Sequence, residues 1–114
     1  MPVVFWMTRL KPEVRPEDYE RWLKKFDYAN AHKIQTIRSY RAYRAEQPFS
    51  EGEKLFDYLE VIEVTDLEEY RRDLEENPAA KAIAQQWGEF LDLVGSLQAE
   101  FIPPGFSRHP AQEI

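Results

Sequence analysis

The residues in this sequence that could do chemistry are acid–base groups. There are two histidines, His32 and His109, and no cysteine, which excludes a thiolate nucleophile and a cysteine-ligated metal site. A glycine-rich phosphate loop, a GxSxG serine elbow and an HExxH zinc motif are absent. Carboxylates, tyrosines and one histidine remain, and with an aromatic pocket these suffice for proton transfer on a small organic molecule. Nucleotide, serine-hydrolase and zinc chemistry therefore lose their usual signals, and acid–base groups are the remaining candidates.

His32 is the histidine that could act as a general acid or base, because imidazole changes charge in the useful pH range. It lies five residues after Asp27, so the two side chains would share a pocket only if their helix breaks between them. The alternative, which we favour, is a solvated histidine at a helix C-terminus, where the helix dipole stabilises it. His109 lies near the end of the chain and has little catalytic weight.

Carboxylates also run through residues 56–64, FDYLEVIEV, which the β-branched and aromatic content predicts to be a strand. Successive side chains of a strand point to opposite faces, so Tyr58 and Glu60 share one face and Glu63 lies on the other. If the first face meets the helices, Glu60 is the better pocket residue, with Tyr58 beside it. The favoured alternative is cross-strand pairing of Glu60 or Glu63 with an arginine of the preceding strand, Arg38, Arg41 or Arg44.

Aromatic residues make up 14% of the chain, which is a high share for 114 residues. Trp6, Trp22 and Trp87 come from three different predicted elements and could line one cavity. Core packing is the simpler interpretation, because apolar stripes at helical spacing are usually core.

The elements that must position these groups follow the order β-α-β-β-α-β. Strands are predicted over residues 3–10, 36–44, 56–64 and 97–102. The first helix begins at Pro16, and its sheet-facing stripe is Tyr19, Trp22, Leu23, Phe26 and Ala29. The second begins after Thr65 and Asp66, is interrupted at Asn77 and Pro78, and ends at Gly95. This order predicts an α+β, ferredoxin-like fold in which a four-stranded antiparallel sheet has both helices on one face.

One domain over residues 1–102 and a polar tail over 103–114 account for the whole length. The unbroken apolar character of residues 3–10 predicts that the second face of the sheet is apolar too. A symmetric partner sheet is the simplest cover for it, so we expect a homodimer built face to face.

The charge of the chain argues against some partners. Fifteen Lys and Arg against 21 Asp and Glu give a net charge of -6, which repels nucleic acid and anionic membrane surfaces. No stretch resembles a signal peptide or a transmembrane helix. With no cysteine, these features predict a soluble protein of the cytoplasm.

Three segments resemble the RedY-like or HapK family of dimeric α/β-barrel proteins. They are FDY at 26–28, IRSYRAYR at 37–44 and, most specifically, FDYLEVIEVTDL at 56–67, and the resemblance extends over residues 3–102. It implies a small cofactor-free protein of prodigiosin-type pigment and other pyrrole or indole pathways, which assists condensation or cyclisation of an aromatic intermediate. It also points to Asp27 and Tyr28. That carboxylate could orient a histidine or hold a pyrrole or indole N–H, and a contact at the helix end is the alternative.

The resulting hypothesis has Asp27 and His32 as proton-transfer residues and a small aromatic molecule as the ligand. The residues expected to bind and orient that ligand are Trp22, Tyr28, Tyr58 and Glu60. If Asp27 is buried it must have a partner, because an unpaired buried carboxylate costs several kcal/mol. Two other functions remain open, a cofactor-independent monooxygenase of electron-rich aromatics and a non-catalytic binding or chaperone barrel.

Overall fold

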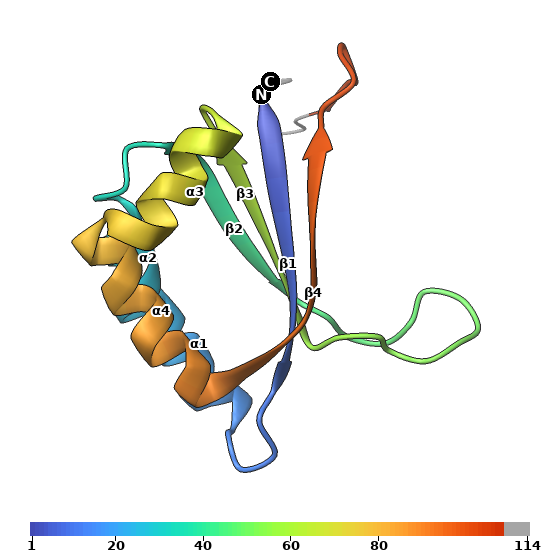
Figure 1. The fold of residues 1–114 in the computed structure, drawn as a ribbon. Helices are drawn as coiled ribbons and strands as arrows, with labels where there is room; N and C mark the ends of the chain where they lie inside the picture. Colours follow the sequence, from blue (N-terminus) through green and yellow to red (C-terminus); the bar gives the residue numbers. More distant parts are fainter. Residues whose placement is uncertain (109–114) are drawn as a thin grey trace, which may run out of the picture.

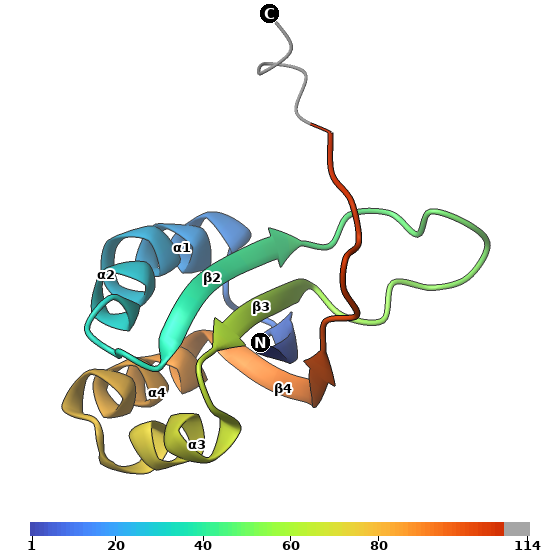
Figure 2. The same ribbon diagram turned by 90° about the horizontal axis from the view of Figure 1, so that it is seen from above.

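The computed structural model describes residues 1–108 and has the element order expected from the sequence. One antiparallel sheet contains β1 (Pro2–Leu10), β2 (Ile37–Arg44), β3 (Tyr58–Val64) and β4 (Leu91–Glu100), in the spatial order β2-β3-β1-β4. The helical segments are α1 (Pro16–Trp22), the π-helical turn η1 (Leu23–Asp27), α2 (Tyr28–Ala31), α3 (Leu67–Glu76) and α4 (Pro78–Phe90). The helices cover one face of the sheet and leave the other bare, in the predicted α+β arrangement (Figures 1 and 2).

The sheet places its most apolar strand in the middle. β1 pairs with β3 on one side and with β4 on the other, as its continuous apolar sequence indicates. β2 lies at the edge of the sheet, which agrees with the polar side chains on both of its faces. One long side of β2 is therefore free of strand pairing.

Strand alternation decides which side chains meet the helices. In β3, Tyr58, Glu60, Ile62 and Val64 are buried, while the residues between them are only half-buried. The face that contains Glu60 is thus the helix-covered face, which was the condition for Glu60 to be a pocket residue.

The first helical segment runs without a break from Pro16 to Ala31, but its middle turn is wider than an α-helix. Its buried residues are Tyr19, Leu23, Asp27 and Ala31, a constant spacing of four. In a regular α-helix, a residue four positions along is rotated about 40° beyond a full turn. The π turn has more residues per turn, which offsets part of this rotation. The predicted stripe is therefore wrong at its end, because Asp27 faces the sheet and Ala29 is exposed.

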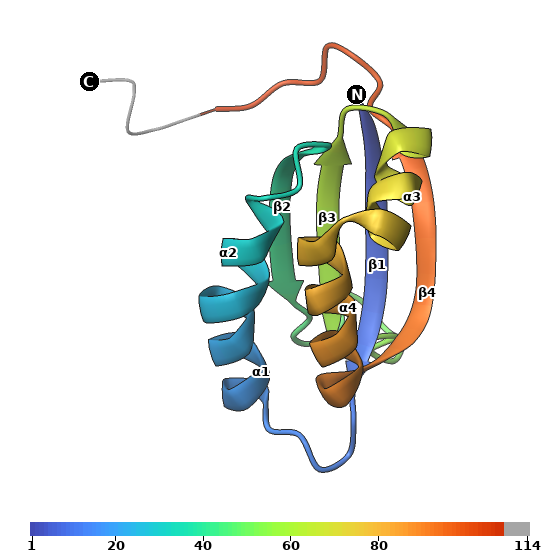
Figure 3. The same ribbon diagram turned by 60° about the vertical axis from the view of Figure 1, so that its left-hand side comes forward.

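The helices α3 and α4 begin at the capping residues that the sequence indicates. Asp66 caps α3 by accepting a hydrogen bond from the Glu68 N–H, and Asn77 caps α4 by accepting from Ala79 and Ala80. Pro78 occupies the first turn of α4, where a missing N–H costs nothing. In the view of Figure 3, α4 lies beside the α1–α2 segment over the sheet, and α3 lies above the start of α4.

The end of α4 differs from the prediction. The helix stops at Phe90 and β4 begins at once with Leu91, whereas the apolar pattern predicted helix as far as Gly95. Leu91, Asp92 and Leu93 instead pair with the end of β1, with an irregularity in the pairing between Met7 and Thr8. Pairing along nearly all of β1 outweighs the local helical pattern, and β4 ends at Glu100 rather than at 102.

The connection 45–57 between β2 and β3 extends away from the helices (Figure 1). Residues 103–108 of the predicted tail contain no helix or strand, and 109–114, with His109, lie outside the described residues. Within residues 1–108, no helix has the length and apolar character needed to cross a membrane.

Candidate functional site

A cavity of about 290 Å³, here called the main cavity, lies between the sheet and the helices. Its walls are mostly apolar, and two of the three tryptophans, Trp6 and Trp87, line it. The polar groups of its lining include two carboxyls, Asp27 and Glu60. The other lining residues are Ala31, Ile34, Ile37, Tyr40, Ile62, Tyr70, Leu74, Ala80, Ile83, Ala84 and Leu93.

The two carboxyls are buried and joined by one phenol. Asp27 is 2% exposed and Glu60 is 4% exposed. The Tyr40 hydroxyl lies 2.6 Å from Asp27 Oδ2 and 2.8 Å from Glu60 Oε1. Asp27 therefore has the partner that its burial requires.

The proton count of this group is constrained by the chemistry of a phenol. The Tyr40 hydroxyl has one proton, so it can donate only one of the two short hydrogen bonds. In the other bond the phenol oxygen must accept, which requires a proton on that carboxyl. Three oxygen acids in a row, Asp27, Tyr40 and Glu60, thus share protons in a site shielded from water.

Burial makes both carboxyls weaker acids than usual. Desolvation raises the pKa of Asp27 to about 7, helped by the nearby charge of Glu60 and opposed by the hydrogen bond from Tyr40. Desolvation also raises the pKa of Glu60, against hydrogen bonds from Tyr40 and Trp87. A carboxyl with a pKa near neutrality can both give and take a proton at physiological pH.

Trp87 stabilises the ionised form of Glu60 relative to that of Asp27. Its indole Nε1–H donates to Glu60 Oε2 at 3.2 Å, so the ionised form of Glu60 has a second donor. Asp27 has no such second donor within residues 1–108, where Tyr40 is the one hydrogen-bond partner of its side chain. The arrangement favours a protonated Asp27 that donates to Tyr40, which in turn donates to an ionised Glu60.

Four different elements position this group. The π turn η1 turns Asp27 inward, and the helix-facing side of β2 presents Tyr40. β3 presents Glu60 on its buried face, and α4 places Trp87 above it.

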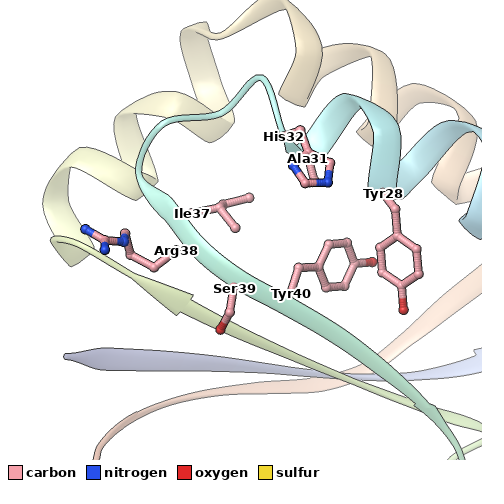
Figure 4. Close-up of a pocket in the computed structure, with 7 residues that line it drawn as sticks. All are labelled: Tyr28, Ala31, His32, Ile37, Arg38, Ser39 and Tyr40. Carbon is pink, nitrogen blue, oxygen red and sulfur yellow. The ribbon is translucent and has the colours of Figure 1, made fainter.

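A second opening of about 360 Å³, here called the edge pocket, lies between α2 and the free side of β2 (Figure 4). It is lined by Tyr28, Ala31, His32, Ile37, Arg38, Ser39 and Tyr40. The Tyr28 and Tyr40 rings meet edge to face, with centroids 4.9 Å apart. Tyr40, Ala31 and Ile37 line both openings, so they form the wall between them.

The predicted site residues divide between these places. Asp27 and Glu60 meet in the main cavity, whereas His32 and Tyr28 line the edge pocket. The helix does not break before His32, which is its exposed C-cap residue.

Trp22 and Tyr58 line neither opening. The Trp22 indole donates to Gln86 Oε1 at 2.7 Å, and its ring stacks near Phe26. Tyr58 is buried, and its hydroxyl donates to Glu20 Oε2 at 2.7 Å.

The favoured arginine pairing is wrong for Glu60. Its carboxylate accepts from Tyr40 and Trp87, and Arg44 instead pairs with Glu20 at 2.6 Å. Glu63 makes no ion pair with any residue of the described part of the chain. On the buried face of β3, the Glu60 carboxylate is therefore held by the neutral donors Tyr40 and Trp87 and not by an arginine.

Tyr40 is the residue of the candidate site that the sequence did not predict. It stands in the polar, alternating segment 37–44, and that alternation was the only signal that side chains of this strand reach a polar cavity. Among the described residues, no cluster of three or more His, Cys, Asp or Glu side chains could hold a metal ion.

The family model for the REDY-like protein HapK matches residues 2–102. The chain belongs to this family. Its fold is similar to the crystal structure of HapK from Hahella chejuensis, with a TM-score of 0.79 and 22% identity over 96% of this chain and 100% of that one. A search of curated protein sequences gave no match.

Two further solved structures have the same fold at lower similarity. An ethyl tert-butyl ether d (EthD) family protein from Bacillus halodurans has a TM-score of 0.65 and 18% identity, covering 90% of this chain and 100% of that one. A dimeric protein of unknown function and ferredoxin-like fold from Bacteroides fragilis has a TM-score of 0.62 and 16% identity, covering 88% and 94%. These likenesses agree with the ferredoxin-like α+β fold predicted from the sequence.

Proposed function

We propose that this HapK family member catalyses proton transfer on a small aromatic intermediate held in the main cavity, without metal or cofactor. The observation that supports this most is the buried pair of carboxyls joined by the Tyr40 hydroxyl at the wall of an apolar cavity. An apolar lining with a few convergent polar groups is the usual make-up of a small-molecule site.

In the proposed reaction, Asp27 is the general acid and Glu60 the general base. The Asp27 O–H turns from Tyr40 to a carbonyl oxygen of the ligand and gives it the proton, and Glu60 takes a proton from the carbon next to that carbonyl. The products are a neutral enol, an ionised Asp27 and a protonated Glu60. Tyr40 then returns the proton, since it can accept from Glu60 while it donates to Asp27. Such a step prepares a carbonyl compound for condensation or cyclisation.

The ligand class follows from the lining. Trp6 and Trp87 offer flat apolar surfaces to an aromatic ring, and Asp27 can accept from a ligand N–H through Oδ1 or donate its own O–H to a ligand carbonyl. A pyrrole or indole carbonyl compound has both features, which suits a pigment-type biosynthetic pathway in the cytoplasm. His32 lines the edge pocket and not the main cavity, so it has no step in this reaction. Its part in proton transfer stays a prediction.

A homodimer is part of the proposal. The helix-free face of the sheet is here called the outer face. It has apolar side chains from β1, β3 and β4. Leu97 is 59% exposed there, and the Bacteroides relative with this fold is described as dimeric. A second copy packed on the outer face would remove these side chains from water.

Deuterium exchange tests the proposed chemistry without knowledge of the natural substrate. 2-Acetylpyrrole in D2O exchanges its methyl hydrogens through the enol, and proton NMR follows the loss of that signal. We expect the protein to accelerate the exchange, and Asp27→Asn and Glu60→Gln to lower the acceleration on the order of 100-fold. Glu63→Gln is the matched control, because Glu63 lies on the opposite face of the same strand.

The proposal fails if the wild-type protein exchanges the probe no faster than buffer, or if Asp27→Asn and Glu60→Gln exchange it at the wild-type rate. Saturable binding of 2-acetylpyrrole without faster exchange would favour a non-catalytic binding barrel.

A further inference from the structure

We propose that the edge pocket is a separate binding site for a small aromatic carboxylate. The pocket lies on the other side of Tyr40 from the main cavity and opens beside the unpaired edge of β2 (Figure 4). Its own residues support the inference, which does not depend on the reaction proposed for the main cavity.

The charges around the pocket favour an anion. None of its lining residues is acidic, although acidic residues outnumber Lys and Arg by 21 to 15 in the whole chain. Neither His32 nor Arg38 makes an ion pair with any residue between 1 and 108, whereas four other arginines do: Arg15, Arg21, Arg44 and Arg71. The Arg38 guanidinium, a cation, and the His32 imidazole, an N–H donor, are therefore free to bind a ligand.

The free edge of β2 adds a backbone donor. The Ala42 N–H points away from the sheet and donates to the Tyr28 hydroxyl at 3.1 Å. In an antiparallel pair, alternate residues turn their N–H groups to the same side, so the Tyr40 N–H also points out of the sheet. Tyr40 lines the pocket, and its N–H is placed to donate to a carboxylate oxygen there.

The remaining walls select an aromatic ligand over an inorganic anion. Ala31 and Ile37 are apolar, and the edge-to-face rings of Tyr28 and Tyr40 can extend their contact to a third ring. In Figure 4, His32 points into the opening, and Arg38 lies at the end away from the tyrosines. Arg38 is exposed and can rotate over the ligand, where its guanidinium fits a carboxylate with two parallel hydrogen bonds.

Occupation of the edge pocket would reach the main cavity through Tyr40. A ligand there contacts the ring whose hydroxyl lies between Asp27 and Glu60. Binding at the edge is therefore expected to restrict the phenol that joins the two carboxyls.

Titration with benzoate, followed by amide NMR spectra of the protein, tests the site. Benzamide is the neutral probe of the same shape. We expect benzoate to shift the amide signals of His32, Arg38 and Tyr40 saturably, with a Kd of about 1 mM or below, and benzamide to bind at least tenfold more weakly. The double variant His32→Gln with Arg38→Gln should bind benzoate at least tenfold more weakly.

Arg72→Gln is the matched control, because Arg72 is exposed on α3 and does not line the pocket. It should leave the Kd for benzoate unchanged. The inference is overturned if those three amides show no saturable shift up to ~10 mM benzoate, if benzamide binds as well, or if the double variant keeps the wild-type Kd. Arg38→Gln alone replaces the double variant if the latter does not fold. Binding is read without turnover, so a negative result leaves the proposed proton transfer standing.

Discussion

At the scale of single residues, the unusual feature is a tyrosine that serves two buried carboxyls at once. Asp27, Tyr40 and Glu60 lie within short hydrogen-bond distance in series, and Trp87 biases the far end toward the ionised state. A buried polar network of this kind is favourable only when each member is satisfied. The site therefore depends on retaining a proton, which links its chemistry to pH.

The stability of Asp27→Asn should depend less on pH than that of the wild type. The pKa of Asp27 is raised in the folded state from 3.8 to about 7, so the folded state binds the extra proton between these values. The wild type then loses stability as the pH rises from about 4 to about 7, by up to about 4 kcal/mol, and asparagine cannot lose that proton. Urea unfolding at a series of pH values measures the difference. If the free energy of unfolding changed equally with pH in both proteins, the result would contradict the raised pKa.

Replacement of Tyr40 by phenylalanine removes the shared hydroxyl. We expect Tyr40→Phe to lower the free energy of unfolding by about 1–3 kcal/mol, because two buried carboxyls lose a hydrogen-bond partner. Tyr43→Phe is the control, since Tyr43 is 51% exposed. Chemical denaturation at neutral pH compares the two, and equal losses would show that the bridge contributes nothing.

The sequence predicted some of these residues and not others, for physical reasons. Period-two alternation placed Glu60 on one face with Tyr58, and burial cost required a partner for Asp27. Tyr40 lies 13 residues from Asp27 and 20 from Glu60, and only the packing of the edge strand against the helix brings the three together. His32 and Asp27 could share a pocket only if the helix broke between them, and the continuous helix places His32 in another pocket.

At the scale of elements, the π turn explains how an acidic residue enters the core. A regular helix from Pro16 would move the buried stripe around its surface, and η1 keeps Tyr19, Leu23 and Asp27 in line. The Tyr28 N–H donates to the Leu23 carbonyl, the five-residue bond that widens the turn. The sequence could not predict this, because the apolar pattern there also fits a regular α-helix.

The capped start of α4 stabilises the helix that positions Trp87 in the site. Asn77 Oδ1 accepts from the Ala79 and Ala80 N–H groups at 2.8 and 3.3 Å. Asn77→Ala should lower the free energy of unfolding by about 1 kcal/mol through loss of this cap. Gln85→Ala, at an exposed position of α4, should change it by less than about 0.5 kcal/mol. Thermal unfolding of both variants measures the effect, and an unchanged Tm for Asn77→Ala would refute the role of the cap.

At the scale of the whole molecule, a sheet with helices on one face leaves the second face in need of a cover. The layer arrangement, the central β1 and the edge position of β2 were all predictable, because each follows from an apolar or alternating pattern. The start of β4 was not, since residues 91–94 have a helical pattern and only pairing with β1 makes them a strand.

A charge on the outer face should separate the proposed dimer. Leu97 pairs with Phe5 across the sheet and is exposed in the single chain, so Leu97→Glu would place a carboxylate in the interface. We expect the variant to be monomeric at concentrations where the wild type is dimeric. Gln98→Glu, on the helix-facing side of the same strand, should stay dimeric. Light scattering after size-exclusion chromatography gives both masses, and a monomeric wild type would contradict the dimer.

The protonation state of Asp27 is the most direct test of the proposed chemistry. A carbon-13 NMR titration of the side-chain carboxyls in the folded protein can follow Asp27 and Glu60 separately. We expect a midpoint for Asp27 at a pKa of about 7, and a lower midpoint in Glu60→Gln, where the neighbouring negative charge is gone. A midpoint near 4 in the wild type, unmoved by Glu60→Gln, would contradict it.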